Sequence, residues 1–250
     1  MSVARVTAIL SLVALLGCGS SSPPSEHRAA SPTEPVGSHA PSHVRTSSVA
    51  VPSGRGHLAA LATRRGLTLR DRPGGKVLAH LRAKTEWGSP TVVWAAEQRG
   101  RWLGVVASAV GNNRIAWVDV AHDRPLMWRS QLSLQADLSA RTLELRRGAR
   151  VIRRMSIGIG SPDTPTPVGR FSVTDKLIPG RDLSFYGCCL LALSGRQSHL
   201  RPGWAGGDRV AIHGGSVGGA ASAGCIHAND ADLKRLMKVV PIGTPVYIRS

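Results

Sequence analysis

Hydrophobic and polar residues follow a pattern that divides the chain into four stretches. Residues 1–17 hold one continuous apolar run, and residues 18–56 show no hydrophobic period. From residue 57 onward, short alternating segments are separated by Gly, Pro, Asn and Asp, which is typical of β-strands joined by tight turns. The pattern therefore predicts a mainly β chain in two parts, residues 57–127 and 128–250, with only one or two helices.

Residues 57–127 are expected to form a small β domain. Its strand candidates are the segments 66–70, 76–81, 91–96, 102–107 and 115–118. Short strands with tight turns between them favour a small barrel. Trp94, Trp102 and Trp117 could line a sugar-binding groove in such a barrel, but packing in its core is the preferred interpretation.

Residues 128–250 predict a second, mainly β domain with one clear helix. Residues 142–154 alternate around a central Gly and indicate a hairpin. Apolar residues with helical spacing follow later: Leu233, Leu236, Met237 and Val240. Asn229 or Asp230 would cap the start of this helix, and a Pro-Ile-Gly stretch would end it.

The composition narrows the range of partners. The 250 residues include 32 basic and 15 acidic ones, a formal net charge of +17, and 42% of the chain is hydrophobic. That hydrophobic content is sufficient for a folded core, and such a charge attracts nucleic acid, anionic lipid or anionic cell-wall polymers. The basic residues are scattered and do not interleave with aromatic ones, which argues against nucleic acid. Anionic cell-wall polymers remain as candidate partners.

The N-terminal apolar run predicts the compartment. Val6–Leu16 is too short to span a bilayer and follows a single basic residue, as in a secretory signal peptide of residues 1–17. The run ends in Leu-Leu-Gly-Cys, which resembles the bacterial lipobox, so Cys18 is expected to carry a lipid that anchors the chain to the membrane. The alternative is an ordinary signal peptide with a chance cysteine. Residues 18–56, rich in Ser, Pro and His, would be a disordered tether.

The candidate chemistry lies between His213 and Cys225. An apolar strand candidate, residues 210–212, leads into His213 and a Gly-rich loop, and Cys225 comes just before the predicted helix. A thiol beside an imidazole or a helix N-terminus ionises more easily and becomes a better nucleophile. Ala223 and Gly224 would leave room for backbone N–H groups that face an oxyanion. The alternative is a buried structural cysteine and a core histidine, and the spacing alone leaves both interpretations open.

Separated motifs occur in order along the second domain. They are Thr164–Phe171, Ile212-His213-Gly214, Ser222-x-Gly224-Cys225-Ile226, Asp232 and Gly243–Val246. Together they closely resemble the L,D-transpeptidase catalytic domain family, the YkuD family, over roughly residues 130–250. The resemblance implies a mainly β sandwich with the catalytic cysteine in a cleft. In the first domain, the Leu-Arg-Asp-Arg-Pro-Gly-Gly and Gly-Arg-Trp-Leu-Gly-Val pieces resemble bacterial SH3-like wall modules.

The resemblance implies a role for each matching residue. Cys225 would be the nucleophile, and His213 the base that forms a thiolate–imidazolium pair with it. The carbonyl of Gly214 would orient the imidazole, the N–H groups of Gly224 and Cys225 would form the oxyanion hole, and Ser222 would brace the turn. The reaction would be acyl transfer on peptidoglycan stem peptides: D-Ala leaves, a thioester forms, and a neighbouring amine takes the acyl group to give a 3→3 cross-link. No metal or organic cofactor would be needed.

The chain also departs from the family pattern. Ala223 stands where the family usually has His, and His227 stands where it usually has an Arg that helps to hold the site and the substrate. A histidine there carries less charge at neutral pH, which could weaken activity, shift its pH range or mark a changed substrate. Cys188 and Cys189 are expected to be two partly buried thiols, because adjacent cysteines rarely bridge each other. Tyr186 beside them is a candidate for the wall of the cleft.

The leading hypothesis is a lipid-anchored, extracytoplasmic peptidoglycan L,D-transpeptidase. Two variants of the same chemistry stay open: an L,D-carboxypeptidase, in which water takes the acyl group, and an enzyme that attaches proteins to the wall. The competitor from another class is a non-catalytic wall-binding lipoprotein. Its support comes from Ala223, His227 and the SH3-like segment.

Overall fold

The computed structural model describes residues 51, 53–204 and 206–250, and these residues belong to one compact unit. The predicted signal peptide, Cys18 and most of the predicted tether lie outside the described residues. Within the described residues, no helix has the length and apolar character that a membrane crossing requires.

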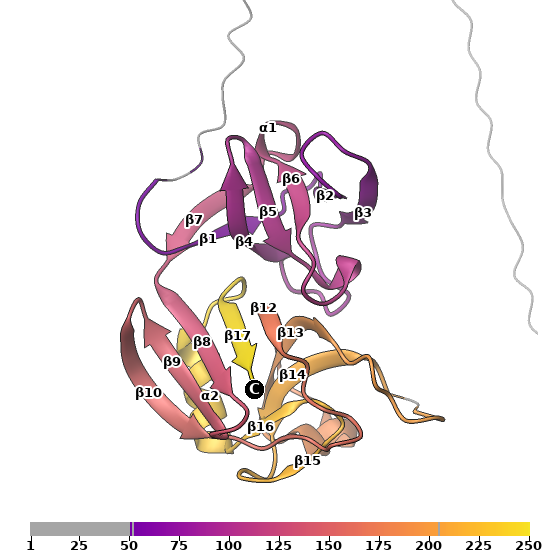
Figure 1. Ribbon diagram of the computed structural model, residues 1–250, viewed down its shortest axis with the longest axis vertical. Coiled ribbons are helices and arrows are strands. Elements are labelled where there is room, and N and C mark those ends of the chain that lie inside the picture. Colours follow the sequence, from indigo (N-terminus) through magenta and orange to yellow (C-terminus); the bar gives the residue numbers. More distant parts are fainter. Residues whose placement is uncertain (1–50, 52, 205) are drawn as a thin grey trace, which may run out of the picture. The chain divides into compact units, whose positions relative to one another are not determined.

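The first sheet contains seven strands in the order β3-β2-β6-β5-β4-β1-β7 (Figure 1). They are β1 His57–Leu61, β2 Leu67–Arg70, β3 Val77–Leu81, β4 Val92–Arg99, β5 Trp102–Val106, β6 Ala116–Asp119 and β7 Leu126–Ser130. The alternation of apolar and polar residues explains why these segments form strands. In β2, Leu67 and Leu69 are fully buried, whereas Thr68 and Arg70, which follow them, are half-buried. All five predicted strand segments overlap a strand of this sheet. Its likeness to an SH3-like barrel, and the domain bounds at residues 57 and 127, stay predictions.

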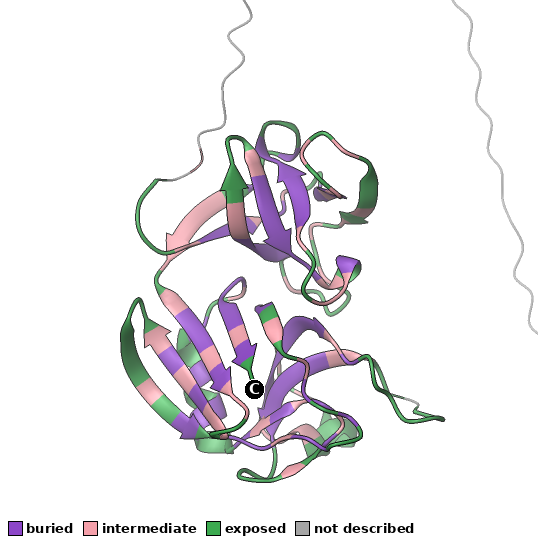
Figure 2. Cartoon of the chain, in the orientation of Figure 1, coloured by how far each residue is buried: buried purple, intermediate pink, exposed green. Residues whose placement is uncertain are grey.

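The second sheet contains eight strands in the order β10-β9-β8-β17-β12-β13-β14-β16 (Figure 1). They are β8 Leu132–Asp137, β9 Thr142–Arg147, β10 Arg150–Ser156, β12 Gly169–Leu177, β13 Leu190–Arg196, β14 Arg209–Gly214, β16 Ile226–Ala228 and β17 Pro245–Arg249. The pairs β8–β17 and β14–β16 are parallel. Two further short strands, β11 Ile159–Gly160 and β15 Ala220–Ser222, pair with each other. Figure 2 shows β13, β14 and β17 largely buried and the edge strand β10 largely exposed.

The predicted helix is confirmed as α2, Asp230–Val239. Asn229 caps it, because its side-chain oxygen accepts a hydrogen bond from the Asp232 N–H at 2.9 Å. Leu233 and Leu236 are fully buried in the core of the second sheet, as their helical spacing predicts. The other helical segments are short: η1 Ser108–Val110, α1 Val120–Asp123 and η2 Arg181–Tyr186. The prediction of a mainly β chain is confirmed.

Side chains join the two sheets within the compact unit. Trp94 of β4 is buried and its ring meets Tyr247 of β17 at 5.4 Å between centroids. The Asn112 side chain donates to the Arg196 carbonyl and accepts from the Arg196 N–H. Trp117 is also buried, which confirms packing as the role of Trp94 and Trp117, whereas Trp102 is half-buried.

Candidate active site

Strand alternation brings His213, His227 and Cys225 to the same face of the second sheet. In the parallel pair β14–β16, Ile212 aligns with Ile226 and His213 aligns with His227. Ile212 and Ile226 point into the core under α2, so their neighbours in sequence point to the opposite face. Cys225 precedes Ile226 by one residue and therefore shares the face of His213 and His227.

The register also fixes the separation of the two candidate catalytic residues. Cys225 lies beside Ala211 on the neighbouring strand, and its thiol is hydrogen-bonded to the Ala211 backbone. His213 is two residues further along β14, which places its Cα about 8 Å from that of Cys225. The structure thus brings together the cysteine and histidine that the sequence pairs.

The Gly214 carbonyl orients the His213 ring. The His213 Nδ1 lies 2.7 Å from the Gly214 oxygen. Because a carbonyl oxygen can only accept, the neutral ring carries its proton on Nδ1, and Nε2 keeps the lone pair that a base needs. The ring stands edge-on to Tyr186, with centroids 4.8 Å apart, and lies 4.6 Å from the His227 ring.

Burial favours the neutral forms of both groups. It lowers the pKa of His213 to about 4, with the Gly214 hydrogen bond opposing the shift and the His227 ring adding to it. It raises the pKa of the Cys225 thiol, which the hydrogen bond to Ala211 partly offsets. Burial thus favours a thiol and a neutral imidazole at this site, and the thiolate–imidazolium pair that the family resemblance implies stays a prediction.

Ser222 braces the turn that carries Cys225. Its hydroxyl donates to the Cys225 carbonyl at 2.6 Å and accepts from the Gly224 N–H at 3.1 Å. The bracing expected of Ser222 is thus present. The same contact occupies the Gly224 N–H, which the resemblance assigns to the oxyanion hole, so this N–H would have to leave Ser222 in order to bind an oxyanion.

Gln197 is a buried residue of the site that the sequence does not single out. Its side-chain nitrogen donates to the carbonyls of Pro165 and Ala223, at 3.0 and 3.1 Å. Gly224 has a φ of +108°, and a Cβ at this position would come within 2.0 Å of that nitrogen. The glycine is therefore required both by its backbone angle and by the close approach of Gln197.

A second brace comes from the segment that the family pattern marks as a strand entry. The hydroxyl of Thr164 is buried and donates to the Ser222 carbonyl at 2.9 Å. Ser161 also donates its N–H to that carbonyl. Contacts of this kind join segments about 60 residues apart, and no local pattern in the sequence signals them.

His227 lies against the Gly-rich loop and not in open solvent. A Cβ on Gly215 would approach its ring to 2.8 Å. Burial lowers the pKa of His227, and a hydrogen bond to the Ser216 backbone opposes this shift. The position that the family usually fills with Arg is therefore occupied here by a half-buried, neutral ring.

Cys188 and Cys189 require a correction, because the structure joins them by a disulfide. The prediction of two free thiols rested on the strained geometry of a bridge between adjacent cysteines. These two residues lie between η2 and the first residue of β13, outside regular strand geometry. Just before them, Gly187 packs so closely on Gly214 that a Cβ on either glycine would lie within 2.7 Å of the other's Cα.

A cavity of about 540 Å³ opens beside Cys225. Tyr186 lines it, as the sequence suggests, together with Leu190, Ala192 and Ala211 from the same sheet face. Several rim residues are exposed apolar side chains, among them Ile178 and Phe185. In the described ranges, no three His, Cys, Asp or Glu side chains gather as metal ligands would. The arrangement offers a nucleophile, a base and an apolar recess for an acyl group.

Comparison with known proteins finds similarity in this half of the chain. The model of the L,D-transpeptidase catalytic domain, YkuD, matches residues 132–248. Putative L,D-transpeptidases YkuD of Bacillus subtilis and Bacillus licheniformis are each 32% identical over 120 residues, which is 46% of this chain. The match spans 64% of the length of either relative.

Solved structures of the same name show a weaker likeness. An L,D-transpeptidase from Mycobacterium smegmatis has a TM-score of 0.38 at 18% identity, covering 77% of this chain and 82% of its own. A mutant of the Enterococcus faecium L,D-transpeptidase has a TM-score of 0.39 at 21% identity, covering 62% and 72%. Over residues 132–248 the chain is thus similar to the L,D-transpeptidase catalytic domain, YkuD, by its match to the family model and to both relatives.

Proposed function

We propose that the protein is a peptidoglycan L,D-transpeptidase that forms 3→3 cross-links through a thioester on Cys225. One observation carries the proposal: Cys225 and His213 share a sheet face beside an apolar cavity, with the His213 Nε2 left as an acceptor by the Gly214 carbonyl. If Cys225 and His213 had only a structural role, neither the oriented imidazole ring nor the cavity beside the thiol would be needed.

The first half of the reaction forms the acyl-enzyme. The Cys225 sulfur attacks the carbonyl carbon of the third, L-centred stem residue while the His213 Nε2 takes the thiol proton. Because the resting pair is neutral, this proton moves during the attack and not before it. The tetrahedral oxyanion is stabilised by backbone N–H groups of the Cys225 turn. The imidazolium then protonates the leaving D-Ala amine, and a thioester remains on Cys225.

The second half releases the acyl group. An amine from a neighbouring stem attacks the thioester, His213 takes its proton, and the sulfur leaves and regains a proton from the imidazolium. With water in place of the amine, the same steps give an L,D-carboxypeptidase, which is the alternative product outcome. Extracytoplasmic location, a lipid on Cys18, SH3-like wall contact and attraction to anionic wall polymers complete the proposal, and they rest on the sequence alone.

A carbapenem adduct tests the nucleophile. The strained β-lactam carbonyl is electrophilic and would be trapped by an activated thiol beside an oxyanion site. Intact-mass spectrometry under reducing conditions is expected to show one adduct on the parent protein and none on Cys225→Ala. Ser222→Ala is expected to acylate more slowly, because it loses the brace of the turn.

Product analysis with stem peptides then separates the two enzymatic outcomes. A cross-linked dimer supports the transpeptidase, and a tripeptide alone supports the carboxypeptidase. If the parent protein forms no adduct and releases no D-Ala, but binds peptidoglycan as well as Cys225→Ala does, the wall-binding hypothesis replaces both.

A further inference from the structure

The loop between β3 and β4 of the first sheet is fastened to the second sheet. The Thr85 hydroxyl donates to a carboxylate oxygen of Asp175, which is fully buried. Glu86 forms an ion pair with Arg209, the first residue of β14. The loop is tight, because Thr85 accepts from the Gly88 N–H and donates to Ser89. This turn presents Trp87 at its tip.

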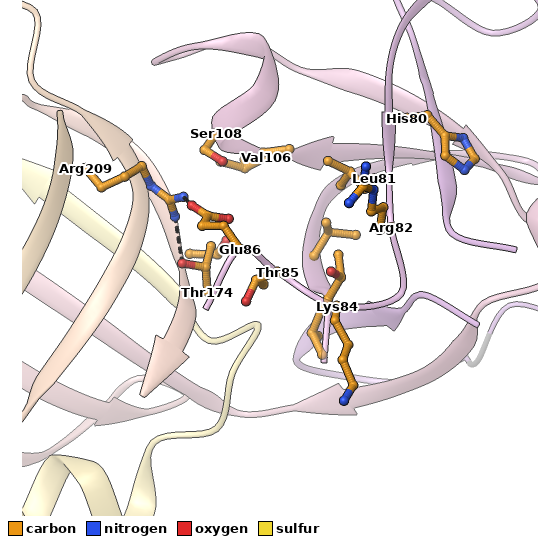
Figure 3. Close-up of a pocket in the computed structure, with 15 residues that line it drawn as sticks. His80, Leu81, Arg82, Lys84, Thr85, Glu86, Val106, Ser108, Thr174 and Arg209 are labelled. Atoms are coloured by element: carbon orange, nitrogen blue, oxygen red, sulfur yellow. Dashed lines mark hydrogen bonds and ion pairs between the residues drawn. The ribbon is translucent and has the colours of Figure 1, made fainter. Parts of the chain in front are cut away.

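Arg209 is held firmly from several directions (Figure 3). Its guanidinium donates to the Thr174 hydroxyl at 2.8 Å and to the Leu193 carbonyl at 2.7 Å, and its side chain is only 10% exposed. The same guanidinium lies 5.0 Å from the centre of the Trp87 ring. A fixed cation over an indole ring orients that ring. Arg209 therefore positions both Glu86 and Trp87.

Trp87 and Cys225 line the same cavity of about 540 Å³. Arg209, Ala211 and His213 lie on one face of β14, because every second side chain of a strand points the same way. The cavity runs along this face, from Arg209 beside Trp87 to Ala211 beside Cys225. Among the described residues that line it, Arg209 alone is charged, and its charge is already paired with Glu86. Trp87 is 42% exposed, so part of the residue is free to contact a ligand.

We propose that Trp87, in the loop between β3 and β4, forms a wall of the acyl-donor subsite and binds the aliphatic side-chain stem of the third stem residue. This inference rests on the proposed function. The carbonyl of that residue is the one Cys225 attacks, so its side chain must lie next to the thiol. A recess without an unpaired charge suits methylene groups. Trp87 is then a specificity residue, and Arg209 is its positioning residue.

A binding cycle in the Cys225→Ala background tests Trp87 apart from catalysis. Two synthetic tetrapeptide stems ending in D-Ala are compared by calorimetry, one with Lys and one with Ala as the third residue. We expect the Lys stem to bind about tenfold more tightly, since it buries additional methylenes. Adding Trp87→Ala is expected to remove most of this preference. Adding Trp102→Ala is expected to preserve it, because Trp102 is a half-buried tryptophan of β5 that does not line the cavity.

The outcomes separate this inference from the proposed function. Three results would each overturn the role of Trp87. The first is an equal preference for the Lys stem with and without Trp87, and the second is no preference at all in the Cys225→Ala background. The third is that Trp102→Ala reduces the preference as much as Trp87→Ala does. D-Ala release from the Lys stem by the chain with Cys225 intact is measured alongside. If no D-Ala is released but the preference for the Lys stem still depends on Trp87, the proposed enzymatic function is refuted and the binding role of Trp87 stands.

Discussion

At the scale of single residues, the buried position of His213 determines how the site responds to pH. The ring is enclosed by Tyr186, His227 and the Gly214 backbone, and this burial lowers its pKa to about 4. A base must be unprotonated to accept the thiol proton, so activity is lost only as pH falls through the pKa of the folded protein.

The acid limb of kcat/KM is therefore expected to have its midpoint near pH 4, and not near the ordinary pKa of histidine. The raised pKa of Cys225 keeps the thiol protonated through neutral pH, so the profile should be flat from there to the alkaline limb. Stem-peptide turnover measured against pH checks this. An NMR titration of His213 in the Cys225→Ala protein measures the pKa of this ring independently. A midpoint of 6 or higher in both the pH profile and the titration would contradict the lowered pKa of His213.

At the scale of elements, the turn from Ser222 to Cys225 is the most constrained piece of the site. Its conformation depends on the positive φ of Gly224, the hydroxyl of Ser222 and the side chain of Gln197. Each constraint acts on the backbone that carries the nucleophile. A change that leaves every catalytic side chain in place can therefore still disable the site.

Gly224→Ala is expected to destabilise the protein by about 1–3 kcal/mol and to abolish turnover, because the new methyl group would meet Gln197 at a strained φ. Gly219→Ala is the matched control: its Cβ would meet no atom within 4 Å. Chemical denaturation and carbapenem acylation measure the two effects. Equal stability and equal acylation of the two variants would show that the turn tolerates a side chain.

The elements also show what could be predicted from the sequence. Helix α2 was predictable because its cap, its apolar spacing and its end are local signals. The pairing of His213 with Cys225 was predictable only through the family motifs. The contacts of Gln197 with Pro165 and Ala223 were not, because they join residues 32 and 26 positions apart. The prediction of free thiols at Cys188 and Cys189 was wrong, because it rested on how rarely adjacent cysteines form a disulfide.

At the scale of the whole molecule, the two sheets are coupled through buried polar contacts. The clearest is the hydrogen bond from Thr85 to Asp175, whose second carboxylate oxygen is buried without a hydrogen-bond partner among the described residues. A buried carboxylate that loses a hydrogen bond carries a desolvation cost that nothing offsets. This one contact therefore contributes to the stability of both sheets.

Thr85→Val is expected to lower the free energy of unfolding by about 1–3 kcal/mol. Ser139→Ala removes a hydrogen bond of the same type, from the exposed Ser139 to the half-buried Asp137, and is expected to change stability by no more than about 0.5 kcal/mol. Urea denaturation followed by tryptophan fluorescence reports on both sheets, because Trp94 lies between them. A Thr85→Val protein as stable as Ser139→Ala would show that the sheets are coupled by apolar packing alone.

The disulfide has a practical consequence for the whole chain. With Cys188 and Cys189 joined, Cys225 is the free thiol of the described residues, and Cys18 is the remaining cysteine of the sequence. With Cys225 free, counting thiols in the denatured, unreduced protein thus reports whether Cys18 is modified. A count of two means that the N-terminal cysteine is unmodified, and a count of one means that it is blocked. A titre that falls further after exposure to a substrate analogue gives the fraction of enzyme molecules that carry a covalent adduct.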